Sequence, residues 1–501
     1  MQPARLAPSP SGHQSRTDPR GGPAARPLLW LAGLAVVFTL AQLVLVAPGM
    51  GLGWDESVYI SQVGSQAPAA FFSAPRARGI TFLVAPVAGL TTSVDALRVY
   101  LSVLSGCGLL LSLWVWRRLL PVVVVLLAGA LFGGLWITLF YGPQAMPNLW
   151  VAYAALLATG CFLRAVRDPA DRRALTGLFC AVVFAALMRP ADALWLAAPL
   201  AVAALCVRAW RRPAVLLALA AGAALGCAPW IIEAYVGYGG LAARLRRAGE
   251  IQGGMGWKLA FDAQLRAIEG RSLCRPCDVP WRHPATAAWW FALPLLTAGG
   301  VLAAARIHRL AVALVPALAG ISLAVPYLLL IDYAAPRFLL PTYALLALPV
   351  ALCLFRLVTG ARPQLRPLVV AAVVLALAGH YAVQYAVLHV VASRSRETRE
   401  AVGRIAAELH REGLRPPCTV SGEEAVRIAF RTGCSSRQIG GHDGSITRAG
   451  LLEAAGSRPV AVLVAGDRAA PSYTHGWRVQ ELPRLGGRAG FRAYLSPSAQ
   501  P

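Results

Sequence analysis

The sequence is poor in charged residues and almost lacks two polar residue types. Only 14% of its 501 residues are charged, whereas a typical soluble protein carries about 25%. Lys258 is the only lysine and Asn148 is the only asparagine. The low charge excludes an ordinary soluble enzyme. Because 57% of the residues are hydrophobic and lie in long runs, the composition predicts a polytopic α-helical membrane protein.

A signature for nucleic-acid binding is also missing. The formal net charge is +24, but no basic stripe carries the interleaved aromatic residues that suit a polynucleotide. The arginines cluster instead in short loops between apolar runs, as the positive-inside rule requires. Glycine-rich turns near the C-terminus match neither GxGxxG nor GxxxxGK. We therefore expect no nucleic-acid partner and a lipid bilayer as the surroundings.

The apolar runs predict about eleven transmembrane helices. They lie near residues 27–50, 97–116, 119–140, 149–165, 175–188, 191–208, 214–232, 286–304, 310–331, 339–357 and 367–390. The arginine-rich loops between them, such as Arg208 to Arg212, all fall on one side, which is then cytoplasmic. This pattern predicts a multi-pass plasma-membrane protein with a cytoplasmic N-terminus. An odd number of helices places the C-terminus outside.

Three regions follow one another along the chain. Residues 1–26 are rich in proline, serine, glycine and arginine, which predicts a disordered cytoplasmic tail. Residues 27–393 form the predicted membrane domain, with long external loops at 51–96 and 233–285. The hydrophobic pattern of residues 394–501 predicts a small external α/β domain.

Local patterns place elements inside the external regions. In the second loop, Ala242 to Arg247 have a mixed spacing that suits a helix in the plane of the lipid headgroups. Near the C-terminus we expect helices and strands at Glu397–Arg411, Cys418–Val420, Glu423–Arg431, Val460–Val464 and Phe491–Leu495. Ser421 is the expected N-cap of the helix that starts at Glu423.

The ten cysteines divide according to this topology. Six lie in apolar segments, where they act as small hydrophobic residues. The other four are external, where disulfides persist. The simplest pairing is Cys274 with Cys277 and Cys418 with Cys434. The first pair forms a CxxC motif, which can alternatively be redox-active or supply half of a zinc site.

Two adjacent carboxylates follow the first apolar segment, within Trp54 to Tyr59. Asp55 and Glu56 lie at the expected membrane surface, where charged groups are costly unless they are used. A solvated loop is the alternative explanation. The unusual polar residues Asp55, Asn148, Arg189, Glu233 and Arg337 all fall on the same external face. Because these residues share one face, they are more consistent with a functional site than with a solvated loop.

The chemistry available on that face suggests a sugar donor linked to a lipid. Nucleotide-activated sugars are absent outside the cell, so the donor there would be a polyprenyl-phosphate sugar. Asp55 can accept the proton of the acceptor hydroxyl, with Glu56 as its neighbour or as a ligand to a metal or to the acceptor. Candidate groups for the donor phosphate are Arg76, Arg78, Arg244, Lys258 and Arg337. Candidate substrate-binding groups are Tyr59, Asn148, Arg189, Glu233 and Tyr333.

Most of these residues have a simpler alternative explanation. Arg337 can anchor a helix end by snorkelling, and the basic loop residues can attract anionic lipids. Arg189 can belong to a linker between two helices. Glu233 can simply lie at the membrane–water interface, where the nearby Trp230 is an ordinary residue.

Three short motifs follow one another along the chain: the acidic motif Trp54 to Tyr59, an Arg-Pro element in Met188 to Asp192, and an Arg-Phe-x-x-Pro element in Ala335 to Pro341. Together they resemble the first-loop acidic motif, the mid-chain Arg-Pro element and the Arg-Tyr/Phe-x-x-Pro element of the GT-C glycosyltransferase superfamily. The most similar branch contains the protein O-mannosyltransferases and aminoarabinose transferases. The resemblance covers about residues 28–390.

The resemblance implies a GT-C membrane core with an external cap. It also implies an inverting glycosyltransferase in which Asp55 is the base. The donor would be a polyprenyl-phosphate sugar, and the acceptor a glycan, a lipid or a protein. A divalent metal, Mg²⁺ or Mn²⁺, at Asp55 and Glu56 would be consistent with this resemblance.

Two departures from the family pattern leave other functions open. Asn148 stands where the family often has a second acidic residue, and an amide cannot act as a base. The basic-Pro-Pro element of the first loop is reduced to Pro75 to Arg78. The alternatives are a transporter or lipid flippase, which is expected to contain inverted repeats that we do not detect, and a catalytically inactive scaffold.

Overall fold

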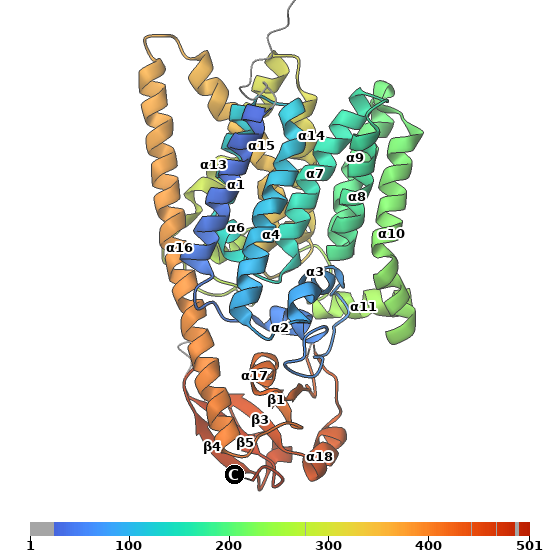
Figure 1. The fold of residues 1–501 in the computed structure, drawn as a ribbon, viewed down its shortest axis with the longest axis vertical. Coiled ribbons are helices and arrows are strands. Elements are labelled where there is room, and N and C mark those ends of the chain that lie inside the picture. Colours follow the sequence, from blue (N-terminus) through green and yellow to red (C-terminus); the bar gives the residue numbers. More distant parts are fainter. Residues whose placement is uncertain (1–24, 276, 442, 467, 486–489, 501) are drawn as a thin grey trace, which may run out of the picture.

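The structure, a computed structural model, describes residues 25–275, 277–441, 443–466, 468–485 and 490–500. The predicted tail at 1–26 therefore lies almost entirely outside the described residues. A long bundle of helices stands on a small mixed sheet at its C-terminal end (Figure 1). The chain is a polytopic helical membrane protein with a small C-terminal α/β region, as predicted.

Eleven helices form the bundle within the described residues. They are α1 (Ala25–Ala41), α4 (Val94–Trp114), α5 (Val122–Gly133), α7 (Pro147–Arg167), α8 (Arg172–Met188), α9 (Pro190–Cys206), α10 (Pro213–Gly237), α13 (Ala288–Arg306), α14 (Ala311–Leu329), α15 (Leu340–Gly360) and α16 (Arg366–Arg411). Each coincides with one predicted apolar segment. In the part of the chain that the structure describes, eight helices are long and apolar enough to cross a membrane. The total number of spans stays a prediction.

Prolines explain where several of these helices begin. Pro147, Pro190 and Pro213 occupy the first turns of α7, α9 and α10, where a missing N–H costs nothing. Helices α7 and α15 are buried along most of their length and form the centre of the bundle. In contrast, α16 is exposed along its apolar part and lies at the edge (Figure 1).

Short helices occupy the loops. They are α2 (Trp54–Ser61), α3 (Gly79–Ala88), α6 (Trp136–Tyr141), α11 (Leu241–Ile251) and α12 (Phe261–Ile268). Helices α2, α3 and α11 lie at the end of the bundle that faces the sheet, and α11 runs across the helix ends (Figure 1). The helix predicted around 242–247 is therefore confirmed.

The C-terminal region is continuous with the bundle through α16, a single helix of 46 residues. The predicted boundary at residue 394 lies inside this helix, so no linker separates the two parts. The remaining elements are β1 (Thr419–Gly422), α17 (Ala425–Thr432), β2 (Ser435–Ser436), α18 (Arg448–Ser457), β3 (Val460–Ala465), β4 (Arg478–Leu482) and β5 (Phe491–Leu495). The order in the sheet is β2-β1-β3-β5-β4. Strands β2, β1 and β3 are parallel, whereas β5 is antiparallel to β3 and β4.

The local predictions for this region are confirmed except at one cap. Strands β1, β3 and β5 and helix α17 lie where they were expected. Ser421 is not the N-cap of α17, because it lies buried in β1. The cap is Glu424, which has a left-handed backbone with φ of 56°. Both predicted disulfides are present, Cys274–Cys277 and Cys418–Cys434.

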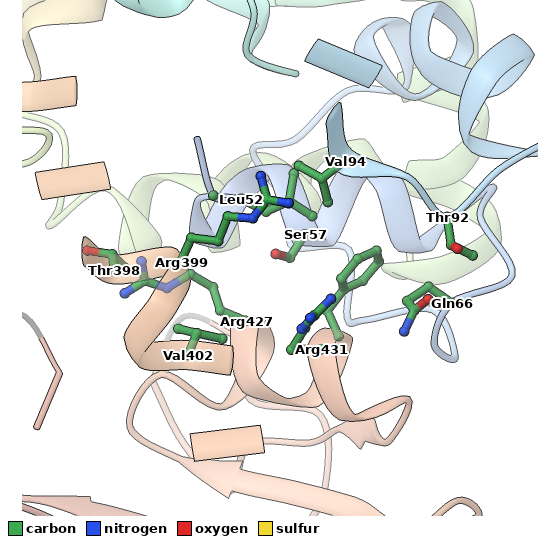
Figure 2. A pocket seen from close by; sticks show the side chains of 12 residues that line it. Leu52, Ser57, Gln66, Thr92, Val94, Thr398, Arg399, Val402, Arg427 and Arg431 are labelled. Carbon is green, nitrogen blue, oxygen red and sulfur yellow. The ribbon is translucent and has the colours of Figure 1, made fainter. Parts of the chain in front are cut away.

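The C-terminal region docks directly on the first external loop. Val426 of α17 packs against Val58 of α2 and against Ala70. Beside this contact Arg399 of α16 binds Asp95 at the start of α4, with two hydrogen bonds of 2.6 and 3.0 Å. Figure 2 shows the seam, where arginines of α16 and α17 face the first loop around a small cavity of about 70 Å³. The two parts therefore form one continuous packed structure.

Candidate active site

The site is built on α2, and Glu56 fixes this helix in place. Its Oε2 accepts the N–H of Gly53 at 2.9 Å, which closes the first turn of α2. The same carboxylate pairs with Arg98 of α4 at 2.5 and 2.9 Å and accepts the N–H of Ala145 at 2.7 Å. Glu56 and Arg98 are almost completely buried. Glu56 thus joins α2, α4 and the loop after α6.

Asp55, the neighbour of Glu56, faces a different environment. Its Oδ1 accepts a hydrogen bond of 2.8 Å from Arg76, and its Oδ2 accepts one of 3.3 Å from Arg337. Burial opposes ionisation, but the charges of Arg76 and Arg337 outweigh it and hold the pKa of Asp55 below its usual value of 3.8. Asp55 is therefore ionised at neutral pH and held between two guanidinium groups.

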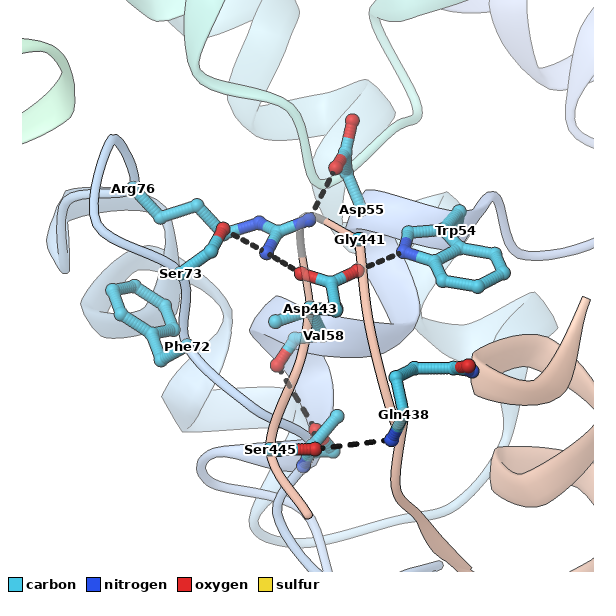
Figure 3. Close-up of polar contacts among 12 residues, drawn as sticks. Trp54, Asp55, Val58, Phe72, Ser73, Arg76, Gln438, Gly441, Asp443 and Ser445 are labelled. Atoms are coloured by element: carbon cyan, nitrogen blue, oxygen red, sulfur yellow. Dashed lines mark hydrogen bonds and ion pairs between the residues drawn. The ribbon is translucent and has the colours of Figure 1, made fainter. Parts of the chain in front are cut away.

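Arg76 also binds a carboxylate from the C-terminal region. Its Nη1 donates to Asp443 Oδ1 at 3.0 Å, while its Nη2 donates to Asp55. The other oxygen of Asp443 accepts the indole N–H of Trp54 at 2.8 Å. Figure 3 shows this chain of contacts from Asp55 through Arg76 to Asp443 and back to Trp54. Residues 55, 76 and 443 thus meet at one point.

Two cavities meet at Asp55. The larger, of about 650 Å³, lies between α2, the loop after α6, residues 270–275 and the outer part of α16. The smaller, of about 480 Å³, lies between α2, residues 73–77, Arg189, Tyr333 and the C-terminal region. Asp55, Arg337 and Arg275 line both cavities. A group bound in one cavity can therefore approach a group bound in the other beside Asp55.

Several predicted substrate-binding residues line the smaller cavity. Tyr59 and Tyr333 do so, and burial raises the pKa of Tyr59 to about 12 and raises that of Tyr333. Both phenols stay protonated and can donate hydrogen bonds. Arg189 also lines this cavity and is held from behind by Tyr327 at 2.8 Å and Asp192 at 2.9 Å. These three residues are brought together with Asp55.

Arg244, Arg78 and Glu233 form a neighbouring cluster that supports the first loop. Arg244 is completely buried and donates to the carbonyl oxygens of Ala74 at 3.0 Å and Arg76 at 3.0 Å. Glu233 accepts from Arg78 at 2.5 Å and from Arg244 at 3.2 Å. None of the three lines either cavity at Asp55. They hold the segment that carries Arg76.

Two further predicted residues lie apart from Asp55. Lys258 binds Asp332 at 2.9 Å and lines neither cavity. Asn148 is buried at the start of α7, and neither atom of its amide forms a hydrogen bond within the described structure. Its neighbour Met146 lines both cavities and Pro147 lines the smaller one, but Asn148 itself lines neither.

Two residues of the site, Arg275 and Asp443, were not predicted from the sequence. Arg275 stacks on Tyr333, with 4.6 Å between its Cζ and the ring centre, and donates to Ile251 O at 2.9 Å. The available signal was its place between the cysteines of the external CxxC motif, where a disulfide limits its movement. Asp443 gave no comparable signal, because its surroundings show only a glycine-rich turn.

A divalent cation does not fit the donor set that the structure describes. Both oxygens of Asp55 accept hydrogen bonds from arginines, and both oxygens of Glu56 are bound to Arg98. Among the described residues no three His, Cys, Asp or Glu side chains are grouped to hold a metal ion. The guanidinium groups of Arg76 and Arg337 also oppose a cation at Asp55. The described residues at Asp55 and Glu56 therefore do not form a site for the expected Mg²⁺ or Mn²⁺.

A third cavity lies within the bundle. It has a volume of about 710 Å³ and is lined almost entirely by apolar residues of α5, α13, α15 and α16. Phe132, Trp289, Tyr343 and His380 are its aromatic members. The same helix α16 lines this cavity at Val383 and the larger cavity of the site at Val391. Eight helical residues separate these positions by about 12 Å along the axis.

Comparison with known proteins identifies the fold. No protein-family model matches the sequence, and no curated protein sequence matches it. Among solved structures, ArnT from Cupriavidus metallidurans bound to undecaprenyl phosphate is similar, with a TM-score of 0.66 and 14% sequence identity. The similarity covers 96% of this chain and 100% of that chain. The apo state of the same protein gives a TM-score of 0.61 over the same shares of the two chains.

The chain thus has the fold of a GT-C membrane protein. One protein that it resembles in architecture is ArnT, an aminoarabinose transferase. At 14% identity this similarity extends to the fold alone. The predicted GT-C core with a C-terminal cap is confirmed.

Proposed function

We propose that this protein is a membrane glycosyltransferase that moves a sugar from a polyprenyl-phosphate donor to an acceptor hydroxyl. The observation that carries the proposal is the position of Asp55, which is bound by Arg76 and Arg337 where two cavities lined by arginines meet. A carboxylate in this position can deprotonate an acceptor in one cavity while a donor occupies the other. The GT-C fold agrees with this chemistry.

The proposed reaction is a single displacement with inversion. The acceptor oxygen forms a bond to the anomeric carbon and gives its proton to Asp55. The bond from that carbon to the phosphate oxygen breaks, and polyprenyl phosphate leaves with the electron pair. Arg337 and Arg275 line both cavities and would stabilise the departing phosphate. Arg189, Tyr59 and Tyr333 would hold the reacting groups from the smaller cavity.

Donor binding would also strengthen the base. In the structure Arg337 binds Asp55, which lowers the pKa of this carboxylate. A phosphate that draws Arg337 away removes one of the two cations beside Asp55. The carboxylate then becomes a better proton acceptor at the moment when the donor is present.

The apolar cavity in the bundle is the proposed place for the prenyl chain. Its lining is hydrophobic, and α16 leads from it to the larger cavity beside Asp55. The similar ArnT structure contains undecaprenyl phosphate, which supports a lipid carrier of this class. A prenyl chain in the bundle would direct its phosphate towards Arg337.

Other predicted residues receive supporting roles in this proposal. Glu56 holds α2, while Arg244, Arg78 and Glu233 hold the segment that carries Arg76. Lys258 with Asp332 ties the loop after α11 to the end of α14. None of these groups is assigned to the donor phosphate.

The proposal is tested with purified protein and two lipids. We expect wild type to bind polyprenyl phosphate more tightly than the uncharged polyprenol, and Arg337→Gln to lose about tenfold in this preference. Arg266→Gln is the matched control, because this arginine pairs with Asp262 one turn away and lines neither cavity. Equal binding of the two lipids by wild type would contradict the proposal and favour a transporter or an inactive scaffold.

A further inference from the structure

A closed turn of the C-terminal region enters the smaller cavity. The turn begins at Gln438, whose carbonyl oxygen accepts the N–H groups of Ser445 at 2.8 Å and Ile446 at 3.2 Å. The hydroxyl of Ser445 in turn accepts the N–H of Gln438 at 3.1 Å. These bonds close the base of the turn. Gln438, Gly440 and Asp443 line the cavity next to Asp55.

Asp443 is anchored on both sides by residues of the first external loop. It accepts a hydrogen bond from Trp54 at 2.8 Å and another from Arg76 at 3.0 Å. Its side chain is only 10% exposed, and that of Arg76 is only 11% exposed. Charge-assisted hydrogen bonds in such a setting are stronger than those at an open surface. The contact therefore fixes the two side chains relative to each other.

The contact determines which way the guanidinium of Arg76 faces. A guanidinium is a planar fork, so fixing one nitrogen directs the others. Asp443 and Ser73 bind Nη1, which leaves Nη2 directed at Asp55. The guanidinium of Arg76 thus lies between two carboxylates, those of Asp443 and Asp55 (Figure 3).

We propose that Asp443 is a positioning residue of the active site, through which the C-terminal region orients Arg76 on Asp55. The proposal rests on the proposed glycosyltransferase function. The C-terminal region is then part of the catalytic centre and not only a cover over it. Asp443 itself acts through Arg76 and does not touch the reacting atoms.

The competing hypothesis is a purely structural tie between the C-terminal region and the first loop. Loss of a purely structural contact lowers the amount of folded protein and weakens the packing of the C-terminal region on the first loop. A positioning residue acts on turnover through Arg76, and its effect disappears when Arg76 is absent. A double-mutant cycle separates these two cases.

The experiment compares full-length variants in lipid nanodiscs with a labelled polyprenyl-phosphate sugar. We expect Asp443→Asn to lower kcat about tenfold to a hundredfold without raising KM for the donor, and Asp443→Glu to recover part of this loss. Glu453→Gln is the matched control, because Glu453 is exposed on α18, and it should behave as wild type. In an Arg76→Gln background, the change Asp443→Asn should cost less than about twofold.

Hydrogen exchange supplies a readout that does not depend on turnover. We expect Asp443→Asn to speed exchange in residues 72–78 and to leave β3 unchanged. An equal loss of kcat from Asp443→Asn with and without Arg76, or an unchanged kcat, would overturn the positioning role. If wild type consumes no donor, the proposed function itself fails. Faster exchange in 72–78 would then reduce Asp443 to a structural tie.

Discussion

At the scale of single residues, Asp55 and Glu56 are neighbours with opposite surroundings. Glu56 is enclosed by Arg98 and backbone N–H groups, whereas Asp55 faces two cavities. The sequence predicted a catalytic role for Asp55, because a paired acid at a membrane surface is costly unless it is used, and this role stays a prediction. It could not divide the roles within the pair, since Arg98 lies 42 residues away from Glu56. Asp443 was not predicted for the same reason, because it lies 367 residues away from Arg76 in the sequence.

The pH dependence of the reaction should show how the cations beside Asp55 lower the pKa of this carboxylate. A base works only when deprotonated, so activity falls as the pH drops through its pKa. Because Arg76 and Arg337 lower this pKa despite burial, the acid limb of wild type should lie below pH 3.8. Arg76→Gln removes one cation and should move the limb to higher pH. A profile of kcat/KM against pH checks this, and a limb that stays in place or moves down would contradict it.

Glu56→Gln should destabilise the protein. The change leaves the buried guanidinium of Arg98 without its charged partner, which costs about 3–5 kcal/mol. Thermal unfolding in detergent measures the loss. Glu400→Gln is the matched control, since Glu400 pairs with Arg404 on an exposed face of α16, and it should change stability by less than about 0.5 kcal/mol. Equal unfolding of the two variants would argue against the role given to Glu56.

At the scale of elements, the short helix α11 supports the site although it does not line the cavities. The sequence predicted this helix from the spacing of Ala242 to Arg247, and it also predicted phosphate binding by Arg244. The structure turns Arg244 inward, onto the carbonyl oxygens of Ala74 and Arg76. The pattern of a helix shows which face is polar, but not which arginine finds a buried carbonyl. That depends on the fold of the preceding loop.

Arg244→Lys should therefore impair turnover although Arg244 lines neither cavity. Lysine keeps the charge but lacks the fork that reaches both carbonyl oxygens. We expect kcat to fall about tenfold, because the variant loses one or two of these hydrogen bonds. The same change at exposed Arg246 is the control and should leave kcat unaltered. If both variants keep wild-type kcat, α11 does not position the site.

At the scale of the whole molecule, the end of the bundle that holds Asp55 also holds the C-terminal region. The order of apolar segments predicted this arrangement, because an odd number of spans places Asp55 and the C-terminus on one side. The eleven segments were recognisable because hydrophobic runs of this length and number are typical of membrane-spanning helices. The boundary at residue 394 was less recognisable. Helix α16 crosses it without a break in helical pattern, and only the composition changes there.

The sidedness of the chain can be measured in intact cells. We expect a tag after the C-terminus to be labelled by an antibody from outside, and a tag before the N-terminus to be labelled only after permeabilisation. The physical reason is the arginine content of the loops on the N-terminal side. Labelling of the N-terminal tag in intact cells would reverse the topology and place Asp55 in the cytoplasm, where nucleotide sugars are present.

The most direct test of the central claim is donor consumption by wild type and Asp55→Asn. Both proteins are purified in nanodiscs, compared by thermal unfolding, and given a radiolabelled polyprenyl-phosphate sugar with and without a metal chelator. Asp262→Asn is the matched control, because this aspartate is exposed and lines neither cavity. We predict that wild type and Asp262→Asn release the sugar with or without chelator, and that folded Asp55→Asn loses about a hundredfold or more in rate. Turnover by Asp55→Asn at the wild-type rate would contradict the account.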